Sequence, residues 1–160
     1  MFAKTKTYLL LFVAIIFSGC DDSYVSSIPD YQVDLNLDLN SSYPTFKNST
    51  NEFLLIETRQ LETDRIGYGG ILVYTGLGLD DSGNTMYYAF DMACPYEAKK
   101  DIKVYPIEGK LGNVKCEECG TIYDVSYGYG YPIEGPSKEV LKKYNTTLTP
   151  YPNQYLRIYR

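Results

Sequence analysis

Apolar and polar residues alternate along several short segments of this chain. In residues 32–39, Val33, Leu35, Leu37 and Leu39 occupy one face of an extended chain, and polar residues occupy the other. An alternation of period two over this length predicts a strand with one buried face. We expect this strand to open the folded part of the protein.

Further short runs rich in β-branched and aromatic residues predict additional strands. These runs are Phe53–Glu57, Ile71–Thr75, Met86–Met92, Lys103–Ile107 and Tyr155–Tyr159. Gly, Asn, Asp and Pro separate them, as is typical of turns. One segment, Pro136–Tyr144, has a helical pattern that begins with a proline. The sequence therefore predicts an all-β domain, a small sandwich or barrel with one short helix.

The first residues have the composition of a bacterial export signal. Lys4 and Lys6 precede an uncharged apolar run, Tyr8–Phe17. This run is too short to span a bilayer, because a spanning helix needs about 20 residues, but it suits a signal peptide. The residues that follow, Ser18-Gly19-Cys20, resemble the lipobox of bacterial lipoproteins, although Phe17 stands where leucine is usual.

The lipobox resemblance implies that residues 1–19 are a removable signal peptide and that Cys20 becomes the lipid-modified N-terminus. The alternatives are an ordinary secretory signal or an N-terminal membrane anchor with an incidental cysteine. Residues 20–31 are then a polar, lipidated tether, and residues 32–160 form the β domain. We expect the protein in the bacterial cell envelope, on the periplasmic face or the cell surface. Asp21 and Asp22 resemble sorting signals but do not decide between these two places.

The charge of the chain argues against one class of partner. Loss of Lys4 and Lys6 with the signal changes the formal charge from −5 to −7. Nucleic-acid binding needs clustered Lys and Arg, so no nucleic-acid partner is expected. An acidic chain is also repelled by anionic lipid, so the acyl chains must hold it at the membrane. The expected partners are the membrane, through the anchor, and an unknown envelope protein or ligand.

Three further cysteines lie in two loops. Cys94 belongs to the segment 93–97, and Cys116 and Cys119 belong to the segment 115–124. Loops whose ends are fixed by a sheet are suited to holding metal ligands. The chain contains no histidine, which excludes hydrolases of the Ser–His–Asp or Cys–His type. A Cys-x-x-Cys spacing also occurs in redox dithiols, but the βαβ pattern of thioredoxin is missing.

Together the two loops resemble the Rieske ferredoxin domain. That family carries Cys-x-His in one loop and Cys-x-x-His-Gly-[Ser/Thr]-x-[Tyr/Phe]-Asp in the next. The second loop here matches with Cys116, Cys119-Gly120-Thr121 and Tyr123-Asp124, and 19 residues separate Tyr96 from Cys116. The resemblance covers residues 53–160. It implies a Rieske-like domain whose two loops form a cluster-binding type of subdomain.

The ligand set departs from that family. Cys94 and Cys116 stand where its cysteine ligands stand, and Tyr96 and Cys119 stand where its histidines stand. A Rieske centre needs two imidazoles on one iron, so no ordinary Rieske [2Fe-2S] cluster is expected. One alternative is a bound Zn²⁺ or iron ion, or a non-standard iron–sulfur centre, with Tyr96, Glu97 or water as fourth ligand. The others are a disulfide between two of the three cysteines and three inert thiols.

The expected compartment bears on these alternatives. The signal has no twin-arginine motif, which indicates export of an unfolded chain, and disulfides persist outside the cytoplasm. Both points favour a metal-free pair of loops. The leading hypothesis is therefore a non-catalytic, cluster-free binding or structural module. The alternative is an electron-transfer protein with a cysteine-ligated metal or iron–sulfur centre.

Overall fold

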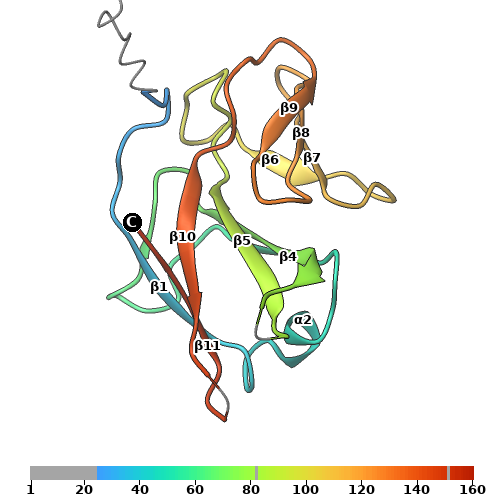
Figure 1. Ribbon diagram of the computed structural model, residues 1–160. Coiled ribbons are helices and arrows are strands. Elements are labelled where there is room, and N and C mark those ends of the chain that lie inside the picture. The colour runs from blue at the N-terminus through green and yellow to red at the C-terminus, as the bar shows by residue number, and fades with distance from the viewer. Residues whose placement is uncertain (1–24, 82, 151) are drawn as a thin grey trace, which may run out of the picture.

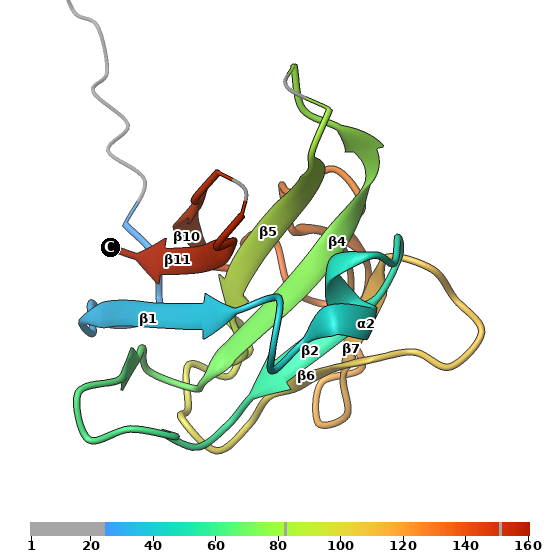
Figure 2. The same cartoon turned by 90° about the horizontal axis from the view of Figure 1, so that it is seen from below.

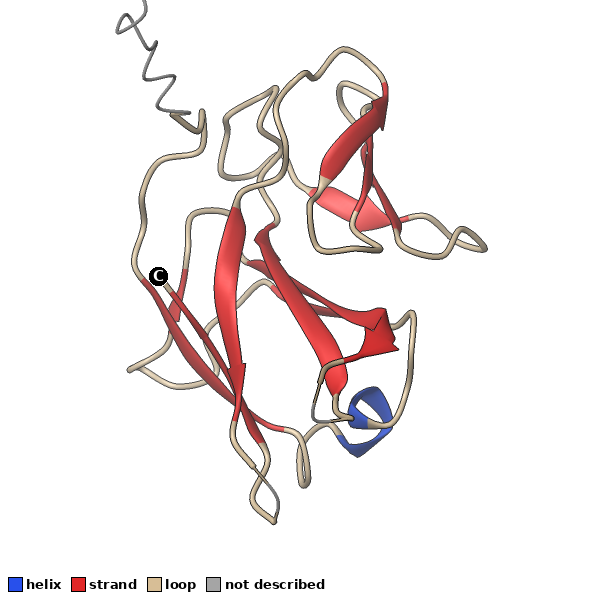
Figure 3. Ribbon diagram, in the orientation of Figure 1, coloured by secondary structure: helices blue, strands red, loops and turns tan. Residues whose placement is uncertain are grey.

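The structure is a computed structural model that describes residues 25–81, 83–150 and 152–160. This part of the chain folds into two antiparallel sheets with almost no helix (Figures 1 and 3). The predicted all-β class is therefore confirmed. The predicted signal peptide of residues 1–19 and the predicted lipidation site Cys20 lie outside the described residues.

The larger sheet has seven strands and is nearly closed into a barrel, as Figure 2 shows from below. Its strands, in the order in which they pair, are β2 (Phe53–Ile56), β4 (Ile71–Leu79), β5 (Thr85–Asp91), β10 (Lys143–Leu148), β11 (Tyr155–Tyr159), β1 (Val33–Asp38) and β3 (Arg65–Ile66). The smaller sheet lies above it in Figure 1 and consists of β6 (Val104–Pro106), β7 (Asn113–Cys116), β8 (Ile122–Asp124) and β9 (Tyr131–Glu134). One short helix, α2 (Pro44–Lys47), begins with a proline.

The helix predicted for Pro136–Tyr144 is wrong. This segment runs without helical hydrogen bonds into β10, and the amide of Leu141 donates to the carbonyl of Gly130 over 2.9 Å. Leu141 and Tyr144 are both buried, but they belong to two different hydrophobic cores. One face of a helix could not place Leu141 and Tyr144 in two cores on opposite sides of a sheet. Strand pairing at β10 therefore overrides the helical spacing of the sequence.

Strands β4 and β5 are buried on both faces and are shared by the two cores. Val73 and its cross-strand partner Ala89 face the inside of the barrel, whereas Leu72 and its partner Phe90 face the smaller sheet. Tyr74 faces the smaller sheet as well. Full burial of an apolar side chain of this size stabilises the fold by about 1.5–3 kcal/mol. Both sheets are therefore held together through β4 and β5.

A buried carboxylate connects these strands to their neighbours. Asp91, at the end of β5, accepts hydrogen bonds from the amides of Tyr68 (2.9 Å), Gly69 (2.9 Å) and Ala93 (2.8 Å), and from the hydroxyl of Tyr144 (2.5 Å). A Cβ atom at Gly69 would lie 2.5 Å from the amide nitrogen of Ala93, so the close approach of the Gly69 backbone requires glycine. Burial, together with the charge of Asp91, raises the pKa of the Tyr144 phenol. The phenol therefore stays protonated and donates to the carboxylate.

We expect Tyr144→Phe to lower the free energy of unfolding by about 1–3 kcal/mol, because a buried acceptor loses one donor. Urea denaturation should show a lower midpoint with an unchanged slope. Tyr155→Phe is the matched control, because Tyr155 is 42 % exposed and should leave the midpoint within experimental error. Equal midpoints for Tyr144→Phe and the unmodified protein would contradict this role of Asp91.

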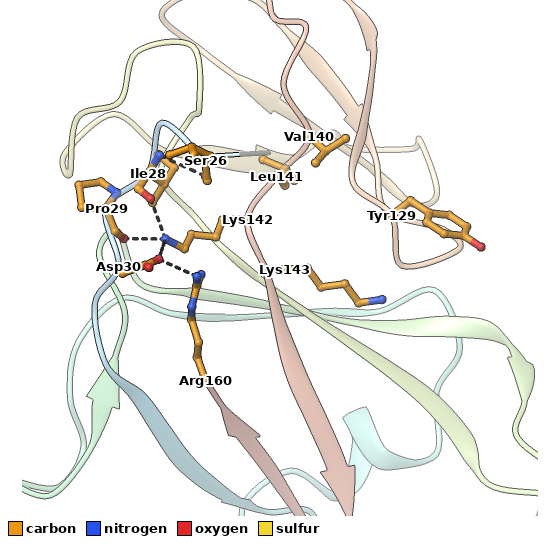
Figure 4. Close-up of a pocket in the computed structure, with 11 residues that line it drawn as sticks. Ser26, Ile28, Pro29, Asp30, Tyr129, Val140, Leu141, Lys142, Lys143 and Arg160 are labelled. Carbon is orange, nitrogen blue, oxygen red and sulfur yellow. Dashed lines mark hydrogen bonds and ion pairs between the residues drawn. The ribbon is translucent and has the colours of Figure 1, made fainter. Parts of the chain in front are cut away.

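Residues 26–30, called the strap below, lie against the start of β10 (Figure 4). The ammonium group of Lys142 donates to the carbonyls of Ile28 (2.7 Å) and Pro29 (2.8 Å) and to the carboxylate of Asp30 (2.6 Å). The side chain of Lys142 is only 3 % exposed, and Ile28 is 1 % exposed. All three protons of this buried ammonium thus bind the strap.

Two further side chains hold the two ends of the strap. Glu139 accepts hydrogen bonds from the Ser26 hydroxyl (3.0 Å) and from the amide (2.7 Å) and hydroxyl of Ser27. Arg160 forms an ion pair with Asp30 at 2.7 Å. Part of the segment predicted as a tether, residues 20–31, is therefore attached to the folded domain.

Lys142→Met keeps the length of the side chain but removes its charge and its three donors. We expect amide hydrogen exchange in residues 26–31 to accelerate by about tenfold or more, because hydrogen bonds to a charged group contribute about 1.5–3 kcal/mol each. Exchange in β4 should stay slow. Lys143→Met changes the exposed neighbour and is the control. Unchanged exchange in the strap of Lys142→Met would show that Lys142 does not hold it.

Candidate metal centre

The first cysteine loop leaves the end of β5 and returns to β6. The amide of Cys94 donates to the carbonyl of Ile102 (2.9 Å), and the amide of Ala98 donates to the carbonyl of Cys94 (2.8 Å). Ala93 also pairs with Lys103 in an isolated bridge. These bonds close residues 94–103 into a compact loop, and Cys94 itself is completely buried.

The other two cysteines lie on the tight turn between β7 and β8. The amide of Gly120 donates to the carbonyl of Cys116 over 2.9 Å, and the amide of Cys116 donates to the carbonyl of Thr121, also over 2.9 Å. Gly120 has a φ of +74°, a conformation that glycine adopts without a steric penalty. The backbone amides of Cys119 and Glu118 act to lower the pKa of the Cys116 thiol. A Cys-x-x-Cys turn with amides directed at sulfur is well suited to binding a metal ion.

The fold brings all three thiols together. The sulfur atoms of Cys94, Cys116 and Cys119 lie within 4.8 Å of one another, and those of Cys94 and Cys119 are 3.7 Å apart. None of the three is in a disulfide. Two thiolates bound to one tetrahedral ion at about 2.3 Å lie about 3.8 Å apart. The observed spacing is therefore close to that of ligands of a single ion.

Two hydroxyl groups lie beside the thiols. The phenol oxygen of Tyr123 is 3.6 Å from the sulfur of Cys94, and the hydroxyl of Thr121 is 3.2 Å from the sulfur of Cys119. Tyr123 and Thr121 are both buried. Burial raises the pKa of the Tyr123 phenol, so this group remains a hydrogen-bond donor. Both residues belong to the motif Cys119-Gly120-Thr121-Ile122-Tyr123, but neither is among the site residues predicted from the sequence.

The thiols differ in their acidity. Burial raises the pKa of the Cys116 thiol to about 12, although the amides of Glu118 and Cys119 act in the opposite direction. Burial also acts to raise the pKa of the Cys119 thiol, but interactions with the Thr121 hydroxyl and amide and with the other two cysteines outweigh it and lower the pKa. Cys119 is also the only one of the three that is partly exposed. It is therefore the most reactive thiol of the cluster.

The fourth ligands suggested by the sequence have different positions from the thiols. Tyr96 is 55 % exposed, and Glu97 is not among the ligand atoms that lie within 4.8 Å of one another. Within the described residues, the group of closely spaced cysteine and acidic ligand atoms consists of the three cysteines. The fold thus brings three thiols together that could hold a metal ion, and neither Tyr96 nor Glu97 joins them.

Comparison with models of protein families, with curated proteins and with solved structures gave no match. The case for a function therefore depends on the geometry of this chain alone.

Alkylation should distinguish the three thiols in metal-free protein. We expect iodoacetamide at neutral pH to modify Cys119 first and to leave Cys94 and Cys116 unmodified, because both are buried and the Cys116 pKa is raised. Mass spectrometry of the cysteine peptides after increasing reaction times measures this order. In urea, where burial is lost, all three should react at similar rates. Modification of Cys116 as fast as Cys119 in the folded protein would contradict the described site.

Proposed function

We propose that this protein is a lipid-anchored envelope protein that binds one metal ion through Cys94, Cys116 and Cys119. The observation that carries the proposal is the cluster of three sulfur atoms within 4.8 Å of one another. Thiolate ligands favour Zn²⁺ and iron over hard cations such as Mg²⁺ or Ca²⁺. With three protein ligands, water completes the tetrahedral coordination.

The mutual closeness of the sulfur atoms favours a single ion over a two-iron cluster. Ligands on opposite irons of a [2Fe-2S] cluster are separated by the cluster itself, whereas all three thiols here lie close to one point. The chain also has no histidine, so it has no imidazole ligands for an ordinary Rieske cluster. We propose a Rieske-like arrangement for the smaller sheet. The meeting of two cysteine loops beside this sheet, one before β6 and one between β7 and β8, supports the proposal.

The surroundings suit bound thiolates. A cation of charge 2+ displaces the protons of its thiol ligands, including that of Cys116, whose pKa burial raises to about 12. The Cys119 thiol donates to the Thr121 hydroxyl in this structure; once metal binding removed that proton, the hydroxyls of Thr121 and Tyr123 would donate hydrogen bonds to the sulfur atoms. Such bonds disperse the negative charge of three thiolates around one divalent ion.

A second candidate is a metal-free module closed by a disulfide. The specific observation that favours it is the 3.7 Å separation of the Cys94 and Cys119 sulfur atoms. A small movement and a two-electron oxidation, by an external thiol oxidant that takes up both electrons while the two thiol protons are released, would join them in a disulfide. The bond would join the two cysteine loops and leave Cys116 as a buried free thiol. An oxidising envelope compartment supports this candidate.

Metal titration of the reduced protein tests the leading proposal. We expect one equivalent of Zn²⁺ or Co²⁺ per chain, with a thiolate-to-cobalt absorption band in the Co²⁺ form. Cys94→Ser and Cys116→Ser should each lower the affinity by about 100-fold or more, because each removes a thiolate ligand. Tyr96→Phe and Glu97→Gln are matched controls that keep all thiols. A loss of affinity in either control would identify that side chain as the fourth ligand.

Protein isolated from its native membrane distinguishes the two candidates. Bound zinc or iron with three thiols released on denaturation supports the metal site, and iron with a visible thiolate band supports electron transfer. Metal-free protein with one free thiol would instead establish the disulfide. In that case a reductant should lower the free energy of unfolding by about 2–4 kcal/mol.

The anchor is tested separately. In the described residues, no helix is long and apolar enough to cross a membrane. We expect Cys20→Ala to move the protein from the membrane fraction to the soluble fraction, because the modified cysteine carries the acyl chains. Ser18→Ala, which keeps a small residue two positions before the cysteine, is the control. A Cys20→Ala protein that still sediments with membranes after salt washing would contradict the proposed anchor.

A further inference from the structure

The strap determines where the folded domain meets its N-terminal extension. Ser26 and Ser27 are bonded to Glu139, and Ile28 is buried beside Lys142. If Cys20 carries lipid, as proposed above, only the five residues 21–25 separate it from the first fixed contact. An extended chain of this length spans about 20 Å at most. The face around the strap therefore has to lie close to the lipid head groups.

This face has a hollow with an apolar and aromatic rim. A cavity of about 610 Å³ lies beside the strap and is lined in part by Val25, Tyr129 and Val140 (Figure 4). Val25 is 82 % exposed and Tyr129 is 59 % exposed. Tyr131 stacks on Tyr129 with ring centroids 5.4 Å apart, and it is exposed as well. Tyrosine is favoured at membrane interfaces because its ring is apolar and its hydroxyl stays hydrated.

The charge of the same hollow differs from that of the whole chain. Its lining contains three cationic side chains, Lys142, Lys143 and Arg160, and one carboxylate, Asp30. The chain as a whole has a net charge of −5. The ammonium group of Lys142 is hydrogen-bonded to the strap. Lys143 is exposed, and Arg160 is partly exposed beside Asp30. This local excess of positive charge suits the phosphates of lipid head groups.

We propose that the patch formed by Val25, Tyr129, Tyr131, Lys143 and Arg160 rests on the membrane surface and contacts anionic phospholipid head groups. The anchor supplies the attachment, and the patch sets the orientation. The rest of the domain, which carries the net negative charge of the chain, then faces away from the lipid.

The test replaces residues 1–20 with a hexahistidine tag, so that it does not depend on lipidation of Cys20. The described core residues run from Ile28 to Ile158, so this protein keeps all of them. It is loaded with Zn²⁺ and bound to vesicles of phosphatidylethanolamine and phosphatidylglycerol that contain a nickel-chelating lipid. Amide hydrogen exchange is compared between the vesicle-bound and the free protein.

We expect exchange in residues 126–134 to slow at least about threefold on the vesicles, while exchange in α2 stays the same. The double variant Tyr129→Ser, Lys143→Glu should lose this protection, and both side chains are exposed, so circular dichroism should show an unchanged fold. The matched control is Tyr155→Ser, Lys47→Glu, which alters the same residue types away from the patch and should keep the protection. Replacing phosphatidylglycerol with phosphatidylcholine should weaken it.

Two results would overturn the proposal: equal exchange in residues 126–134 with and without vesicles, or protection that survives in the patch variant. Failure of the anchor is separate, because it appears only in the fractionation of Cys20→Ala. A domain that binds lipid through this patch without natural lipidation would leave the orientation correct and the anchor wrong.

Discussion

The buried carboxylate of Asp91 is the interaction on which the rest of the structure depends. Asp91 is the last residue of β5. Its carboxylate accepts one hydrogen bond from the hydroxyl of Tyr144 in β10 and another from the amide of Ala93, the residue before Cys94. In the glycine-rich turn before β4, the amides of Tyr68 and Gly69 donate the other two hydrogen bonds to this carboxylate. A single anion thus couples the closure of the barrel to the start of the first cysteine loop. An unpaired buried carboxylate is costly, so these four donors have to be placed together.

The two cores follow from the same strands. Because side chains alternate across a strand, β4 and β5 can present Val73 and Ala89 to the barrel and Leu72 and Phe90 to the smaller sheet. The smaller sheet has short strands and packs its buried residues against that second face. Its cysteine turn is therefore positioned by the barrel, and the thiol of Cys94 comes from the barrel side of the site. The site forms only when both sheets are in place.

The sequence predicted the parts of this fold that have a clear period. Apolar and polar residues alternate in residues 32–39 because one face of β1 is exposed to solvent. The runs at β4 and β5 are apolar because both of their faces are buried. Strands β7, β8 and β9 have three or four residues each, which is too short for a period to be recognised, and β9 contains Pro132, a residue that is unusual in strands. The segment before β10 looked helical because Val140 and Tyr144 are four residues apart, a spacing that long-range pairing overrides.

The site was predictable to a similar degree. The Cys-x-x-Cys spacing predicted that Cys116 and Cys119 share one turn, and the family resemblance predicted that Cys94 lies close to them. Local spacing carries no information on the directions of side chains in a loop, so the exposure of Tyr96 and the contact of Tyr123 with Cys94 required the fold. The strap was missed for the same reason. Its only apolar anchor in the described chain, Ile28, stands among polar residues, and its main partner, Lys142, is more than a hundred positions away.

The strap also has a consequence for the time at which the protein folds. Its partners Glu139, Lys142 and Arg160 are near the C-terminal end of the chain, and β1 pairs with β11, the last strand described. Contacts of such long sequence separation form late and slowly. During synthesis residues 26–38 therefore have no docking site until residues 139–160, more than a hundred positions later, have been made. A chain with this topology keeps its N-terminal edge unpaired for most of its synthesis, so closure of the barrel has to follow synthesis of β11.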